Sequence, residues 1–146
     1  MHYPILLTIH LFAALFFIGV VAFEVLMLEA IRKQLPRDLM RQLEGAISAR
    51  ARKIMPWVLL ALFGAGISMA LYQYRPLLAA PLANTFGLML WAKIALAFSV
   101  LCHFFTAMAL RRRAKLQGKY FKRIHLSVFT HMVFIVLLAK WMFYVR

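Results

Sequence analysis

The chain has 146 residues, of which 65% are hydrophobic and only 15% are charged. A soluble domain is roughly 45–50% apolar, so this composition excludes an ordinary soluble protein and indicates an integral membrane protein. The length accommodates four spans of about 20 residues each, and we expect an all-α membrane four-helix bundle forming one domain over residues 1–146. The net charge of +14 is better explained by membrane orientation than by nucleic acid, which we do not expect as a partner.

Four apolar stretches predict the transmembrane helices, over residues 3–27, 54–74, 87–110 and 125–144. The first opens on MHYP with no Lys or Arg and closes on FEVLMLEAIRK, so we expect a retained helix and not a cleaved signal peptide. His10 and Glu24 lie fourteen residues apart in it, which returns them to within about 40° of one helix face. Phe17 lies midway between them on that face.

The segment before the second span is basic and amphipathic. The spacing of Leu39, Leu43 and Ile47 predicts an interfacial helix that feeds into the span. Pro56 falls in the first turns of the span, where a proline is harmless or produces a mild kink. Small residues follow at helical spacing, which permits close approach of another helix, a second copy of the chain or a flat porphyrin: Ala61, Gly64, Ala65 and Ser68.

Basic residues determine the expected orientation. The first and third loops carry seven Lys or Arg each, whereas the second loop carries only Arg75 and the segment before the first span carries none. Since basic loops stay in the cytoplasm, we expect a multi-pass protein of a bacterial inner membrane with both termini on the outer, periplasmic side. Aromatic residues fall at the outer span ends, as in an interfacial belt: Tyr3, Tyr72, Tyr74, Trp91, Trp141 and Tyr144.

Two histidines are predicted to lie at the same depth. His103 is twelve residues from Trp91, and His131 is thirteen residues from Tyr144. At about 1.5 Å per residue, both lie roughly 18–20 Å below the outer belt. Because they belong to the third and fourth spans, which are adjacent in sequence, we expect their rings to face each other.

His10, Lys93 and Lys140 form an outer layer, about 10 Å or less below the belt by the same rise. Their polar groups suit anionic partners such as haem propionates or an acidic substrate. A plainer role also fits the lysines, because a lysine near a span end extends its amine to the headgroups. Lys140 is nine residues from His131, about 180° around a helix, so the two do not face the bundle axis together.

A histidine inside a span needs a partner, because an unpaired polar ring there costs on the order of several kcal/mol. A bis-imidazole haem needs two histidines at one depth on different helices. His103 and His131 meet this requirement and are the candidate iron ligands, with His10 as the alternative second ligand. Plainer explanations stay open. The histidines would be satisfied by local hydrogen bonds, His10 with Thr8 or a neighbouring carbonyl and His131 with Ser127 or Thr130. Glu24 would pair with a loop arginine, and Cys102 would be a small hydrophobe.

The run HLFAALFFIG, His10 to Gly19, is similar to the first helix of the CopD-like copper-resistance membrane proteins, with Phe17 where those usually have Trp. Later features resemble the HemJ-type protoporphyrinogen oxidases. The third span opens with WAKIAL, contains LCHFF late in its length and is followed by an Arg cluster, and the fourth span contains LLAKWMF. The resemblance implies a four-helix membrane protein that holds b-type haem or handles copper, and it favours His10, His103 and Lys140 as functional positions. GVVAFEVLMLEA replaces the Leu-Pro-Arg segment of HemJ enzymes, so haem binding is implied more firmly than protoporphyrinogen oxidation.

Two functions follow as expectations. The first is a b-type haem redox protein in the lipid bilayer, an oxidoreductase that exchanges electrons with a quinone or a porphyrin-like substrate. The alternative is a copper-handling protein without haem, although the nine methionines do not cluster in an outer loop. An assembly factor without chemistry is a third option, and homodimerisation through the small residues of the second span is expected.

Overall fold

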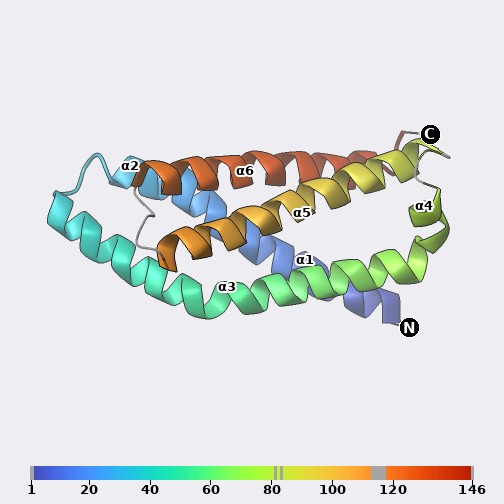
Figure 1. Ribbon diagram of the computed structural model, residues 1–146, viewed down its shortest axis with the longest axis horizontal. Helices are drawn as coiled ribbons and strands as arrows, with labels where there is room; N and C mark the ends of the chain where they lie inside the picture. Colours follow the sequence, from blue (N-terminus) through green and yellow to red (C-terminus); the bar gives the residue numbers. More distant parts are fainter. Residues whose placement is uncertain (1, 81, 83, 113–117, 146) are drawn as a thin grey trace. The chain divides into compact units, whose positions relative to one another are not determined.

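The computed structural model of the protein describes residues 2–80, 82, 84–112 and 118–145, which contain helices and no strand (Figure 1). The helices are α1 (His2–Ala22), the π-helical segment η1 (Phe23–Leu28), α2 (Glu29–Ile31), α3 (Arg37–Gln73), α4 (Arg75–Ala79), α5 (Thr85–Arg112) and α6 (Gly118–Trp141). The predicted all-α fold is confirmed. Arg113 and Lys115, counted above in the third loop, lie outside the described residues.

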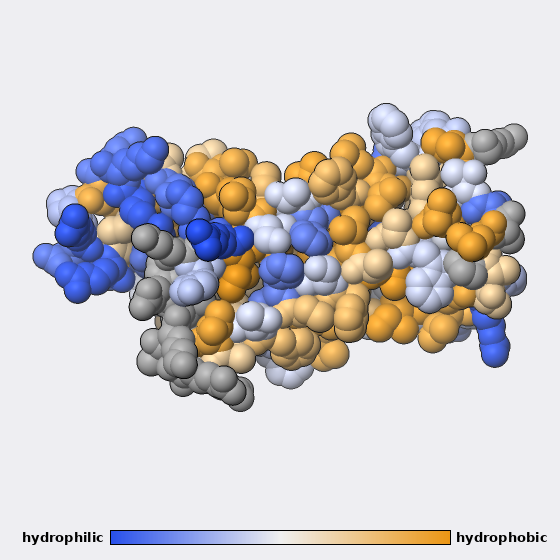
Figure 2. Space-filling view, turned by 45° about the horizontal axis from the view of Figure 1, so that its top comes forward, coloured by the Kyte–Doolittle hydropathy of each residue, from blue (hydrophilic) through white to orange (hydrophobic). Residues whose placement is uncertain are grey.

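Four helical stretches in the described part of the chain are long and apolar enough to cross a membrane: His2–Ile31, Arg37–Gln73, Thr85–Leu110 and Lys122–Trp141. By length and composition, the chain is therefore a multi-pass membrane protein. Hydrophobic residues cover much of the face seen in Figure 2, and hydrophilic residues gather over the end where α2 leads into α3. Large apolar side chains on the helix exteriors suit contact with lipid, as Phe12 illustrates with 70% of its surface exposed.

The chain forms two compact units, Met1–Tyr74 and Arg75–Arg146. In unit 1, α1 packs antiparallel along α3, and in unit 2, α5 packs antiparallel along α6 (Figure 1). Each unit is thus a helical hairpin. The prediction that all four spans form one bundle stays a prediction.

Burial in unit 1 follows the helical repeat. On α1, the buried positions recur every fourth residue and define one face: Ala13, Phe17 and Val21. Phe17 is buried on the face predicted for His10 and Glu24, which are both half-buried. Glu24 itself lies in η1, where the helix is wound more loosely than an α-helix.

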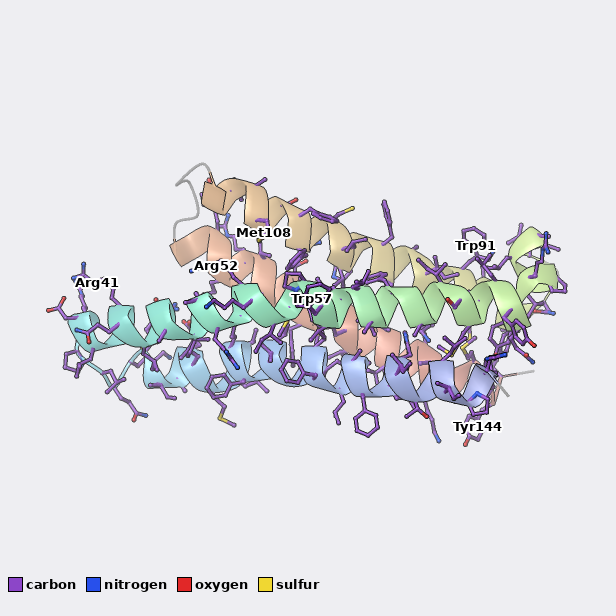
Figure 3. All side chains as sticks on the ribbon, turned by 90° about the horizontal axis from the view of Figure 1, so that it is seen from below. Arg41, Arg52, Trp57, Trp91, Met108 and Tyr144 are labelled. Atoms are coloured by element: carbon purple, nitrogen blue, oxygen red, sulfur yellow. The ribbon has the colours of Figure 1, made fainter. Side chains whose placement is uncertain are left out.

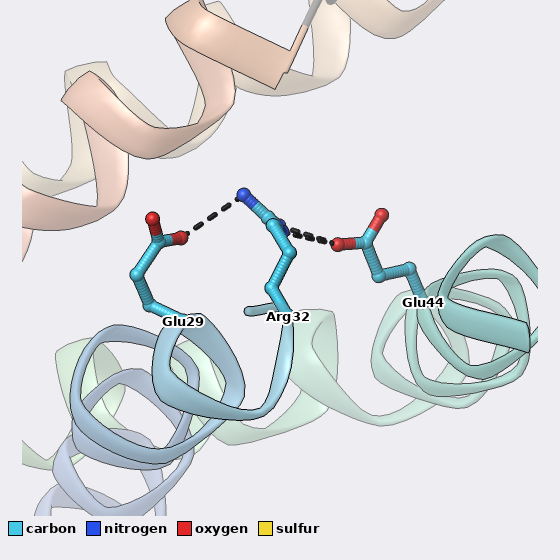
Figure 4. A network of polar contacts seen from close by, with 3 residues as sticks. All are labelled: Glu29, Arg32 and Glu44. Carbon is cyan, nitrogen blue, oxygen red and sulfur yellow. Dashed lines mark hydrogen bonds and ion pairs between the residues drawn. The ribbon is translucent and has the colours of Figure 1, made fainter. Parts of the chain in front are cut away.

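A small ionic network closes the turn of unit 1 (Figure 4). The Nη1 group of Arg32 donates to Glu29 Oε2 at 3.0 Å, and its Nε group donates to Glu44 Oε1 at 2.9 Å. A second contact joins Nη2 of Arg32 to the same Glu44 oxygen. Because Glu29 belongs to α2 and Glu44 to α3, Arg32 holds the two arms of the hairpin together at this end.

Helix α3 is longer than the predicted span, since it runs unbroken from Arg37 to Gln73. The expected interfacial segment is therefore the first half of α3 and not a separate element. Pro36 precedes its first residue and Asp38 lies in its first turn, both favourable at a helix N-terminus. Pro56 consequently lies in the interior of the helix and not in its first turns, and the helix continues through it.

Unit 2 begins with α4 in the predicted second loop, and α5 follows with a capped start. The side-chain Oδ1 of Asn84 accepts a hydrogen bond from the amide of Gly87 at 2.7 Å, which satisfies one of the free amides of the first turn. Helix α6 ends at Trp141, so Tyr144, predicted as the last residue of the fourth span, lies in a turn beyond the helix. In Figure 3, Trp91 and Tyr144 lie towards one end of unit 2 and Met108 towards the other.

Candidate functional site

The structure brings His103 of α5 and His131 of α6 together within unit 2, as equal depth predicts. Their ring centroids are 5.3 Å apart and their planes are inclined by 56°. Both side chains are half-buried. The pair therefore lies where the two helices of the hairpin meet.

The protonation of both rings follows from their hydrogen bonds. His103 Nδ1 lies 2.7 Å from the carbonyl oxygen of Ser99, and His131 Nδ1 lies 2.7 Å from the carbonyl oxygen of Ser127. A carbonyl oxygen only accepts, so Nδ1 carries the proton and donates in each case. In the neutral form of each ring, the Nε2 atom then carries a lone pair.

Each Nε2 atom accepts a hydrogen bond from a serine of the opposite helix. Ser127 Oγ donates to His103 Nε2 at 3.0 Å, and Ser99 Oγ donates to His131 Nε2 at 3.1 Å. Each serine thus binds the histidine of its own helix through its carbonyl and the histidine of the other helix through its hydroxyl. We call these four residues the Ser–His network: Ser99, His103, Ser127 and His131.

Ser127 was expected only as an alternative partner of His131, and Ser99 was not predicted, although the sequence carries a signal for both. The pentapeptides SVLCH (99–103) and SVFTH (127–131) share the pattern Ser-Val-x-x-His. On antiparallel helices, two copies of a motif with its polar residues four apart place the serine of one helix level with the histidine of the other. The repeat is five residues long, too short to stand out without the knowledge that α5 and α6 pair.

The network has a plain structural role, because hydrogen bonds between polar side chains join helices within a membrane. Its donor chemistry also suits a metal. Metal-bound histidines usually donate the distal N–H to a carbonyl or carboxylate, which fixes the ring and leaves the other nitrogen to ligate. Both imidazoles already have this arrangement. Among the described residues, no cluster of three or more His, Cys, Asp or Glu side chains forms a further metal site.

The spacing of the rings distinguishes between metal centres. An ion bound to both Nε2 atoms would have to displace the hydroxyls of Ser99 and Ser127, which now occupy these two positions. A porphyrin between the rings also needs room for the macrocycle, whereas α5 and α6 pack directly against each other. Two imidazoles therefore fit an iron porphyrin by donor chemistry, and the closed hairpin fits it less well by space.

His10 belongs to unit 1 and contacts α3. Its Nδ1 group lies 2.9 Å from the carbonyl oxygen of Leu62, to which it donates. A side chain on Gly66 would place its Cβ 3.0 Å from His10 Cε1 and 3.2 Å from Nδ1. The close approach of α1 to α3 therefore occurs at Gly66, which was not among the predicted small residues, whereas Gly64 has no such neighbour within 4 Å.

The two predicted lysines have different surroundings. Lys93 on α5 is half-buried. Lys140 on α6 is exposed, and its Nζ donates to Tyr144 Oη at 3.1 Å and lies 4.8 Å from the ring centroid. An open hollow of about 390 Å³ adjoins it, lined by Lys140, Trp141, Tyr144 and Val145. This position agrees with the expected 180° separation of Lys140 from His131, and it also suits a lysine that reaches the membrane surface.

Comparisons of the chain with models of known protein families, with curated proteins and with solved structures found no match.

Proposed function

We propose that the protein is a membrane redox protein whose metal centre is held by His103 and His131. The observation that supports this proposal is the shared hydrogen bonding of the two rings, which fixes both Nδ1–H groups on backbone carbonyls and directs both Nε2 lone pairs across the helix pair. Ionisable side chains inside a membrane are functional-site candidates by default.

The proposed centre is b-type haem, with the chain as a member of the CopD-like and HemJ-like membrane proteins. His103 and His131 would be the axial ligands, with His10 as the alternative to one of them, and the cations of Lys93 and Lys140 would neutralise propionates. Bound haem supplies one-electron chemistry. The electron-exchange partner would be a quinone or a porphyrin-like substrate. The protein would lie in a bacterial inner membrane with both termini on the outer side.

A copper-binding function without haem is the second candidate, and one observation favours it. The two rings are 5.3 Å apart on helices in direct contact, which suits a bare ion better than a macrocycle. Imidazole is a good copper ligand. Copper would then be bound by His103 and His131 in the same hairpin.

The visible spectrum and metal content of the protein, purified in detergent from cells supplied with both haem precursor and copper, distinguish the candidates. Haem predicts the sharp Soret and α bands of a low-spin b-type centre and about one iron per chain. Copper predicts about one copper per chain and no haem bands. A colourless protein with neither metal would contradict both candidates and leave the Ser–His network as a contact that joins two helices.

A further inference from the structure

Helix α3 extends well beyond the part that a bilayer covers. Its 37 residues correspond to about 55 Å at 1.5 Å per residue, against about 30 Å of hydrocarbon. The uncharged part of the helix begins at Ile54, and the three cations Arg50, Arg52 and Lys53 directly precede it. We call these three residues the basic collar. The collar therefore lies where the polar headgroups meet the hydrocarbon.

Three of the chain's four Asp and Glu residues form ion pairs with cations outside the collar, and the fourth is Glu24 of η1. Asp38 pairs with Arg41 at 2.6 Å, and Glu29 and Glu44 both pair with Arg32. No ion pair between the collar and an acid occurs among the described residues, and all three collar side chains are exposed. The collar thus presents three exposed positive charges that no ion pair among the described residues neutralises.

An exposed aromatic residue marks the depth of the collar. Trp57 is 69% exposed and follows Arg50 and Lys53 by seven and four residues, which places all three on one side of α3. Figure 3 shows Trp57 partway along α3, with Arg52 near it and Arg41 at the far end of the helix. Trp is enriched at the headgroup level of membranes. Leu60, one turn further along, is 64% exposed and suits the acyl chains below.

From this arrangement we propose that the basic collar binds the phosphate groups of anionic phospholipids in the adjoining leaflet. Arginine presents paired N–H donors that match phosphate oxygens, and lysine adds a second positive charge on the same side. The exposed apolar surface below Trp57 distinguishes a lipid from free phosphate, because only a lipid offers acyl chains to it. Each nearby cation strengthens the binding constant of an anionic headgroup by about fivefold.

The experiment compares lipids retained by the full chain after extraction from vesicles of equal parts phosphatidylglycerol and phosphatidylcholine, measured by native mass spectrometry. The test variant is Arg50→Gln with Lys53→Gln. The matched control is Lys33→Gln with Arg37→Gln, which removes the same charge from exposed positions. Arg37 lies about 20 Å further along the helix, more than two Debye lengths at physiological salt.

Wild type and control should retain phosphatidylglycerol in preference to phosphatidylcholine. In the test variant, the ratio of retained phosphatidylglycerol to phosphatidylcholine should be at least tenfold lower. Raising the salt concentration should weaken the wild-type preference in the same direction. An unchanged preference in the test variant, an equal loss in the control, or no preference in the wild type would overturn the proposal.

Discussion

Gly66 places His10, because the absence of a side chain there makes room for the imidazole. In Gly66→Ala the new Cβ would meet the ring at 3.0 Å, so the ring must shift and its hydrogen bond to Leu62 must lengthen or break. We expect a loss of about 1–3 kcal/mol of stability, typical of overpacking at a tight contact. Thermal unfolding in detergent, followed by circular dichroism, measures the loss.

Gly64→Ala is the matched control, two residues away on the same helix. A Cβ at Gly64 meets nothing within 4 Å, so the higher helix propensity of alanine should leave stability equal or raise it by up to about 1 kcal/mol. Equal losses in the two variants would show that helix packing at His10 does not depend on Gly66.

Substitutions of Ser99 and Ser127 distinguish the two roles of the Ser–His network, which are joining two helices and binding a metal. Replacing either by alanine removes one hydrogen bond between α5 and α6, which should lower stability by about 0.6 kcal/mol and at most about 1.7 kcal/mol. The same change frees an Nε2 atom for a metal, so metal content should stay equal or rise. Ser68→Ala is the control for stability, since that hydroxyl bonds only the Gly64 carbonyl of its own helix. Metal loss in both network variants would contradict ligation through Nε2.

At the scale of elements, the N-terminal end of α1 and the C-terminal end of α3 meet through two tyrosines. Tyr3 Oη and Tyr74 Oη are 3.4 Å apart, and Tyr74 lies just beyond α3. Burial raises the pKa of Tyr74 from 10.0 to about 12, and the hydrogen bond with Tyr3 contributes further. The folded state therefore favours the neutral phenol, so this contribution is complete below pH 10 and is lost as the pH rises through about 12.

Unfolding temperatures measured between pH 8 and 12 test this dependence. The wild type should lose stability above pH 10, and Tyr74→Phe should lose less, because phenylalanine has no phenol to ionise. Tyr72→Phe removes an exposed tyrosine two residues away and should leave the wild-type profile unchanged. A Tyr74→Phe profile identical to the wild type would refute the assignment.

Helix identity was predictable from the sequence and helix ends were not. Long apolar runs predict four membrane-length helices, because backbone N–H and C=O groups in lipid have no water and a helix pairs them within one segment. Charge, however, marks where lipid ends and not where a helix ends. Residues 37–53 are good helix formers and extend α3 into the polar region, so the span predicted from Ile54 is only part of the element. The π-helical turns at Phe23–Leu28 leave no mark in the hydrophobic pattern.

The candidate site was half predictable for a related reason. Depth along two antiparallel helices brings His103 and His131 to one level, and the structure places their rings together. Ser99 and Gly66 escaped prediction, and Ser127 was named only as an alternative partner of His131, because small neutral residues carry no charge or hydropathy signal of their own. Their importance depends on which helix faces which, and that information appears only with the packed hairpins.

For the whole molecule, the basic loops predict the orientation. In a Cys102→Ala background, since Cys102 is exposed, a cysteine at Gln73 should react with a membrane-impermeant maleimide applied outside intact cells. A cysteine at Gln42 should react only after the membrane is opened, because it lies in the basic half of α3. The reverse labelling pattern would place both termini in the cytoplasm.

The most direct test of the proposed metal centre is the metal content per chain of His103→Ala and His131→Ala, each purified beside His125→Ala. Loss of one of two ligands should reduce bound metal at least tenfold in both test variants. The control lies on α6 outside the Ser–His network and should keep the wild-type content. Wild-type metal content in both His103→Ala and His131→Ala would contradict a centre held by this pair.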